Sequence, residues 1–187
     1  MCHFITATLP QGANIDLAVQ VFRSHGLGFK VVHNPHVSPQ LNPGETYILT
    51  TRGHCDCGTA LGSLNRRGPS KDLTYEGEAA KLRKQGWSGA KVQRWLKQKR
   101  EAEDKRNKEV GARAQGGMAD AERWVNLVND LLQSGHANKV GVLLHLYHGG
   151  VETERVSISE RRKVRLADLS PEYVMRMSED ILYEFLT

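Results

Sequence analysis

The chain contains little cysteine and no long apolar run. Only three cysteines occur among 187 residues, and two of them are separated by a single residue, which excludes the disulfide framework of small secreted domains. No apolar run approaches the roughly 20 residues that a membrane-spanning helix needs. The N-terminal residues also lack the basic start and the long apolar region of a secretory signal. We therefore expect a cytoplasmic protein whose thiols serve metal binding or thiol chemistry.

Length, composition and charge predict one domain with a charged appendage. At 39% hydrophobic residues, the chain can bury a substantial core. The net charge of +5 is local, because residues 81–113 hold twelve lysines and arginines against four acids, whereas the rest of the chain holds 14 basic and 17 acidic residues. We therefore expect a single α+β domain over residues 1–187, with a basic helical arm inserted at residues 76–117.

Hydrophobic patterning predicts the order strand, helix, strand, strand, helices, strand. The strongest amphipathic stripe in the chain runs from Ala121 to Leu132, and this helix should pack on the sheet. The simplest compact arrangement is a ferredoxin-like βαββαβ antiparallel sheet packed by helices, because right-handed crossovers leave few alternatives. The predicted strands are residues 2–9, 27–33, 45–51 and 140–148, and the predicted packing helices are residues 15–25 and 121–134.

Two more elements are expected after the fourth strand. Gly149-Gly150 is typical of a hairpin turn, so residues 152–158 should return as an extra strand paired with the fourth. Residues 170–172 (Ser-Pro-Glu) combine a capping serine, a proline at the first helical position and an acid at the positive end of the helix dipole. This pattern predicts a C-terminal helix that runs to about Leu186.

The predicted topology brings all three cysteines to one edge of the sheet. Cys55 and Cys57 lie in a glycine-rich loop directly after the third strand, and Cys2 lies beside His3 at the start of the first. With these two strands as antiparallel neighbours, the start of one and the end of the other share an edge. The fourth strand ends at the same edge, so the converging residues are Cys2, His3, His54, Cys55, Cys57 and His148.

Thiolate and imidazole are the usual ligands of Zn(II), and three cysteines with one histidine form a known type of structural site. We therefore expect a zinc site of Cys2, Cys55 and Cys57, with His54, His3 or His148 as the fourth ligand. The two loop cysteines are closer together than the common pair separated by two or more residues, and Cys2 joins them through topology alone. The alternative is a buried strand cysteine beside a loop that merely contains thiols.

Thiol chemistry is the second interpretation of the same residues. Removal of Met1 would leave Cys2 as an N-terminal nucleophile with its own amine as base, and in this one position the chain resembles the N-terminal nucleophile hydrolases. Alternatively, Cys55 and Cys57 could exchange disulfides as a redox pair. A ring closed over one intervening residue would be strained, and the usual redox pair encloses two residues.

A second functional segment lies within the basic arm. Residues 79–96 resemble the helix-turn-helix pattern of DNA-binding proteins, because an apolar residue in the first helix is followed by Gly86 in the turn, Ser88 as a cap and apolar anchors four apart. The resemblance implies contacts to phosphates or bases from the exposed side of the second helix. The alternative is a helical hairpin whose lysines face water. The residues expected to bind a partner are Lys91, Arg94, Lys97 and Arg100.

Together these patterns predict a non-catalytic binding or regulatory protein with a Cys/His zinc site and a basic helical arm. The arm would contact a protein partner, as in a toxin-neutralising immunity protein, or a nucleic acid. A small thiol enzyme using Cys2, or the Cys55 and Cys57 pair, is the alternative from another functional class. Nothing in the sequence indicates a membrane association or a small-molecule substrate.

Overall fold

The computed structural model describes residues 1–63 and 75–187, with the backbone alone at residues 63, 76 and 103–115. The chain divides into two compact units. The first contains residues 1–66 and 117–187, and the second contains residues 67–116. One long helix, α4 (Gly89–Gln133), supplies residues to both units.

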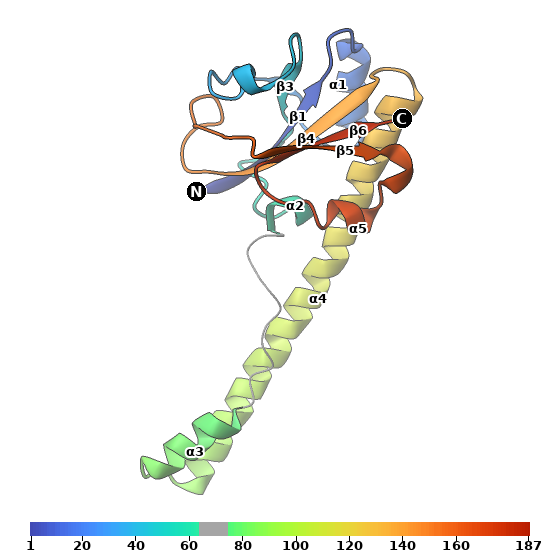
Figure 1. Cartoon of the computed structure of the whole chain (residues 1–187). Coiled ribbons are helices and arrows are strands. Elements are labelled where there is room, and N and C mark those ends of the chain that lie inside the picture. Colours follow the sequence, from blue (N-terminus) through green and yellow to red (C-terminus); the bar gives the residue numbers. More distant parts are fainter. Residues whose placement is uncertain (64–74) are drawn as a thin grey trace. The chain divides into compact units, whose positions relative to one another are not determined.

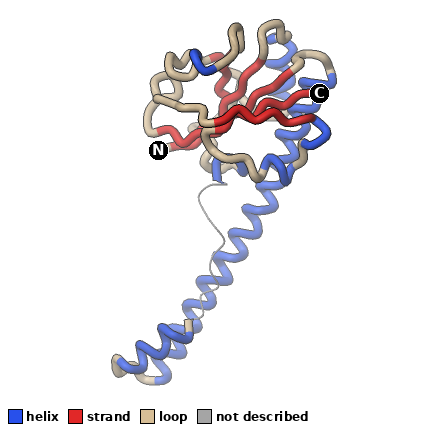
Figure 2. Tube along the Cα trace, in the orientation of Figure 1, coloured by secondary structure: helices blue, strands red, loops and turns tan. Residues whose placement is uncertain are grey.

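The first unit is built on a mostly antiparallel sheet, which has six strands in the described part of the chain (Figure 2). The strand order is β2-β3-β1-β4-β6-β5. β1 lies between β3 and β4 and is antiparallel to both, as the patterning predicts; β5 and β6 form a parallel pair. The strands are β1 (Cys2–Leu9), β2 (Lys30–Val31), β3 (Thr46–Leu49), β4 (Lys139–Tyr147), β5 (Glu160–Arg165) and β6 (Ile181–Leu186).

Helices pack on one face of this sheet. α1 (Ile15–Ser24) begins where the Asn14 side chain accepts a hydrogen bond from the backbone N–H of Leu17, at 3.1 Å. The α4 residues from Gly117 onward carry the predicted apolar stripe, and Trp124 is 2% exposed there. Figure 1 shows α1 and this part of α4 beside the sheet. The short helices of the unit are η1 (Ser38–Gln40), α2 (Ala60–Ser63), η2 (Leu166–Asp168) and α5 (Pro171–Val174).

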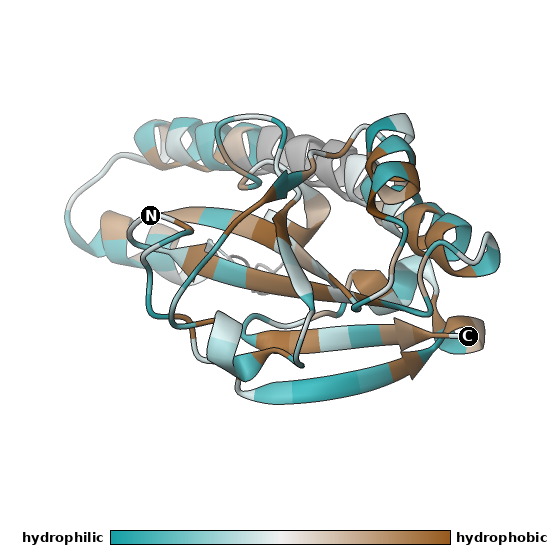
Figure 3. Cartoon of the chain, turned by 90° about the horizontal axis from the view of Figure 1, so that it is seen from above, coloured by the Kyte–Doolittle hydropathy of each residue, from teal (hydrophilic) through white to brown (hydrophobic). Residues whose placement is uncertain are grey.

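The opposite face is covered by loops and by the short helix η1, which lies between Val37 and Leu41. Tyr47 and Tyr147 are buried there, and their hydroxyl oxygens are 3.1 Å apart. Val37 and Val156 pack over them from the loops that follow β2 and β4. Because both faces are covered, the central strands are apolar along most of their length, whereas the edge strand β5 is largely hydrophilic (Figure 3).

The predicted extra strand and C-terminal helix are both wrong. Residues 152–158 form turns and irregular chain, and the added strand next to β4 is β6, which comes from the expected helix. The Ser170 cap does start a helix, but α5 ends at Val174. β6 (Ile181–Leu186) reads ILYEFL and is buried over most of its length, so it gains more by pairing with the free side of β4 than by continuing a helix.

The second unit contains a helical hairpin. α3 (Glu76–Lys84) is followed by a turn at Gly86, whose φ of 83° favours glycine, and α4 then begins after Ser88. Ala79 and Val92 are buried between the two helices. The patterning ends the arm at Gly116-Gly117, but α4 continues through both glycines. The apolar stripe that follows them supplies packing, which outweighs the low helix propensity of glycine.

Candidate metal centre

The three cysteine side chains lie together at one edge of the sheet. Their Sγ atoms are all within 4.8 Å of one another, and each residue is half-buried. Cys2 comes from the first position of β1, and Cys55 and Cys57 come from the loop after β3. The convergence that the topology predicts for the cysteines is confirmed.

The loop reaches Cys2 because it continues to bond to β1 after β3 has ended. The backbone N–H of Asp56 donates to the His3 carbonyl at 2.9 Å, and the His3 N–H donates to Cys57 Sγ at 3.2 Å. These bonds take the positions that a longer β3 would fill. The loop is therefore held along the same strand that carries Cys2.

Asp56 is the residue that fixes the loop. It is 7% exposed, and its Oδ2 accepts hydrogen bonds from the Ile5 N–H at 2.8 Å and from the Thr51 hydroxyl. The carboxylate thus acts as an acceptor for β1 in place of a backbone carbonyl, and it ties the segment between the two loop cysteines to that strand. The sequence alone does not indicate that Asp56 bonds to Ile5, which lies 51 positions away.

The far side of the loop is anchored by α2 and α4. The Ala60 N–H at the start of α2 donates to Asp120 Oδ2 at 2.9 Å, and Asp120 is also paired with Arg123. Gly62 approaches the Asp56 carbonyl so closely that a Cβ there would lie 1.9 Å from its oxygen. Asp120 has no spacing signal that connects it to the cysteines in the sequence.

Two ionisable groups of the loop have shifted pKa values. Burial raises the pKa of Asp56 and outweighs the lowering by its hydrogen bonds with Thr51 and Ile5. The backbone hydrogen bond with Cys57 lowers the pKa of the Cys55 thiol, but the Cys57 and Cys2 thiols and desolvation together raise it above its ordinary value of 9.0. A thiol with a raised pKa is a poor nucleophile at neutral pH.

None of the described histidines joins the group of sulfurs within 4.8 Å. His3 alternates with Cys2 along β1, so its ring lies on the other face of the sheet. The ring is 1% exposed, and its Nε2 is 2.6 Å from Glu179 Oε1. His54 and His148 are exposed. Glu179, which precedes β6, is a partner that the patterning missed because it assigns this segment to a helix.

The donor set fits a thiophilic ion. Three sulfurs bound to one zinc at about 2.3 Å each would lie about 3.8 Å apart. The observed separations of up to 4.8 Å therefore require a closure of only about 1 Å, which a half-exposed loop residue can supply. Thiolate sulfur selects Zn(II), Cu(I) or iron–sulfur chemistry over hard cations such as Mg²⁺.

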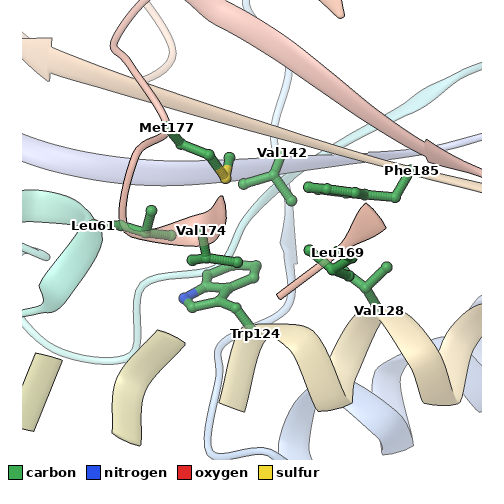
Figure 4. A pocket seen from close by; sticks show the side chains of 8 residues that line it. All are labelled: Leu61, Trp124, Val128, Val142, Leu169, Val174, Met177 and Phe185. Carbon is green, nitrogen blue, oxygen red and sulfur yellow. The ribbon is translucent and has the colours of Figure 1, made fainter. Parts of the chain in front are cut away.

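A small gap in the core lies apart from the cysteines. Figure 4 shows Trp124, Val142, Phe185 and their neighbours turned toward it. All of its lining side chains are apolar, and its volume is about 10 Å³, about the space of one water-sized sphere. This gap is a packing defect and offers no polar group to orient a substrate.

The predicted partner-binding residues lie in the second unit. Lys91, Arg94, Lys97 and Arg100 are all exposed on the N-terminal part of α4.

Comparisons of the chain with protein-family models, with curated proteins and with solved structures found no match. Over the described ranges, no helix has both the length and the apolar character that crossing a bilayer demands.

Proposed function

We propose that this chain is a metal-binding protein whose three cysteine thiolates hold one Zn(II) ion. The observation that carries the proposal is the approach of Cys2, Cys55 and Cys57 to within 4.8 Å from segments more than 50 positions apart in the sequence. A buried carboxylate, Asp56, holds the loop in the conformation that brings them together. Such a supporting residue is typical of metal sites, in which outer partners orient the ligands.

The site supports a structural or regulatory role rather than catalysis. Zinc bound to these sulfurs would join the start of β1 to the loop after β3 and would stabilise that edge of the sheet. His54 and His148 are exposed and adjoin Cys55 and the end of β4, so they are the better candidates for a fourth ligand. His3 would first have to leave Glu179.

The surrounding fold and the state of the thiols support two further parts of the proposal. The element order βαββαβ, with β1 antiparallel to β3 and β4, supports a ferredoxin-like core that β6 and β5 extend. All three cysteines are thiols, a state that the reducing cytosol maintains. We therefore propose that the protein is cytoplasmic.

The test is elemental analysis of the full chain, purified with a thiol reductant and without chelator. We expect about one zinc per chain. Cys55→Ser should lose the metal, because two sulfurs remain. The matched control is Gly58→Ala in the same loop, where an added Cβ meets no atom within 4 Å; this variant should keep the zinc.

The reactivity of the thiols is a second test, and it can contradict the proposal of a zinc site. In the zinc-bound protein the three cysteines should react slowly with a thiol reagent, and a chelator should release the metal and expose them. Wild-type protein that contains no metal, takes up none from added Zn(II), and is rapidly alkylated at Cys2 would overturn the proposal. That result would favour the thiol-enzyme alternative.

A further inference from the structure

The described part of the second unit has a strongly basic surface that the thiol site does not use. Within residues 75–102, eight lysines and arginines accompany three acids. All eight basic side chains are exposed on α3, near its C-terminus, and on the first part of α4. They are Lys81, Arg83, Lys84, Lys91, Arg94, Lys97, Lys99 and Arg100.

Few of these charges are paired with an acid in the described part of the chain. Among the described residues, one ion pair involves them: Lys97 Nζ lies 3.9 Å from Glu101 Oε1, with both side chains largely in solvent. Such an exposed pair contributes little. Lys91 lies over the Trp87 ring at 4.0 Å, and Lys99 over the Trp95 ring at 5.6 Å. These contacts orient the cations without cancelling their charge.

The apolar side chains of the hairpin are already used. Val92 is 0% exposed and Ala79 is 2% exposed, while Trp95 packs edge-on against Tyr75 at 6.1 Å between ring centroids. In the described part of this unit no large apolar side chain is exposed. A stable protein–protein interface needs an apolar centre, and a membrane-surface helix needs an apolar face. This surface offers neither.

From these observations we infer that the basic surface of the α3–α4 hairpin binds the phosphate backbone of a nucleic acid. Lysine and arginine side chains that are exposed and unneutralised gain affinity by releasing counterions from phosphates. Contacts of this kind position a protein on the nucleic acid without reading the sequence. The inference goes beyond the proposed metal site and does not depend on it.

The test measures fluorescence anisotropy of the full chain with a labelled DNA duplex and, separately, a single-stranded RNA of mixed sequence. For four phosphate contacts, the association constant should fall about a hundredfold between about 50 and about 200 mM salt. The Ala variant at Lys91, Arg94, Lys97 and Arg100 should bind at least about tenfold more weakly at the lower salt and lose most of this salt dependence. Circular dichroism verifies that its helices remain formed.

The matched control removes the same number of charges from exposed positions of the first unit, at Arg155, Lys163, Arg165 and Arg176. This variant should bind within about threefold of the wild type, because these four charges belong to the first unit and are not part of the basic surface. Cys55→Ser should also bind normally, which separates this inference from the metal proposal. The inference is overturned if neither nucleic acid binds at about 50 mM salt, if the control loses as much affinity, or if poly-glutamate binds equally well. The last result would indicate an acidic protein partner.

Discussion

The two ends of the central sheet bury polar groups in different ways. At the end where β1 finishes, Lys139 lies between the carboxylates of Glu45 and Glu184, which are 2% and 4% exposed, and Arg161 also pairs with Glu184. At the end where β1 begins, the buried carboxylate of Asp56 accepts hydrogen bonds from neutral donors and holds the cysteine loop.

The two ends of the sheet differ in what their polar groups hold together. In the Lys139 cluster, acids and bases match each other across four segments of the chain, and the arrangement is complete without any external group. In the cysteine loop, the hydrogen bonds of Asp56 serve to gather three sulfurs that are half-buried and open to solvent. The first cluster therefore contributes to the stability of the fold, whereas the second holds three sulfur atoms together at the edge of the sheet.

The largest effect is expected from Lys139→Met. Removal of the central cation leaves Glu45 and Glu184 buried and only partly compensated by Arg161. Breaking a buried pair in this way should lower the free energy of unfolding by about 3 kcal/mol, measured by urea denaturation. Lys163→Met, on the exposed edge strand β5, is the control and should change stability by less than about 0.5 kcal/mol. Equal effects of the two variants would show that the cluster adds no specific stability.

Asp56→Ala should have a smaller effect on stability but a specific effect on the metal. The buried N–H of Ile5 loses its acceptor, which should cost about 2 kcal/mol. Zinc affinity, measured by competition with a chromogenic chelator, should fall about 10- to 100-fold because the loop is released. Asp56→Asn retains one acceptor oxygen and should lie between the wild type and Asp56→Ala in both measurements. Unchanged zinc affinity in Asp56→Ala would make this residue a purely structural one.

The sequence predicts the proximity of the three cysteines, but it does not predict the hydrogen bonds of Asp56 that fix their loop. The encounter of Cys2 with Cys55 and Cys57 follows from strand order and direction, which depend on local patterning and on the handedness of connections. The direction of the Asp56 carboxylate depends on a backbone donor 51 positions away, Ile5. A contact of that kind leaves no periodic signal in the chain.

The C-terminal segment shows where local signals are overridden. Ser170 and Pro171 do start a helix, as their capping chemistry predicts. The helix nevertheless ends at Val174. Asp180, at a φ of 61°, directly precedes β6, and Ile181–Leu186 pairs with both β4 and β5. Whether β4 has an unpaired side depends on how the whole sheet is assembled. The local sequence of residues 181–186 therefore cannot predict that this segment pairs as a strand.

The smallest expected effect is the pH dependence of the stability that the Lys139 cluster contributes. The side-chain hydrogen bonds with Lys139 and Asn42 outweigh the desolvation that would raise the pKa of Glu45, so its pKa lies below the ordinary 4.5. A carboxyl with a lowered pKa adds stability above its unfolded-state value and loses it as the pH falls through its folded-state value. For Lys139, desolvation would lower the pKa, but the bonds to Glu45 and Glu184 raise it above 10.5, so its contribution persists until alkaline pH.

We therefore expect wild-type protein to exceed Glu45→Gln in unfolding free energy across neutral pH. The difference should shrink as the pH falls below 4.5 and should vanish once Glu45 is protonated in both states. The measurement is urea denaturation of both proteins in a pH series at constant ionic strength. Glu152→Gln is the control, because the exposed pair of Glu152 with Lys30 should contribute little at any pH. A constant difference between wild type and Glu45→Gln down to full protonation would mean that the carboxyl acts through packing, and the charge-matching account of this end of the sheet would fail.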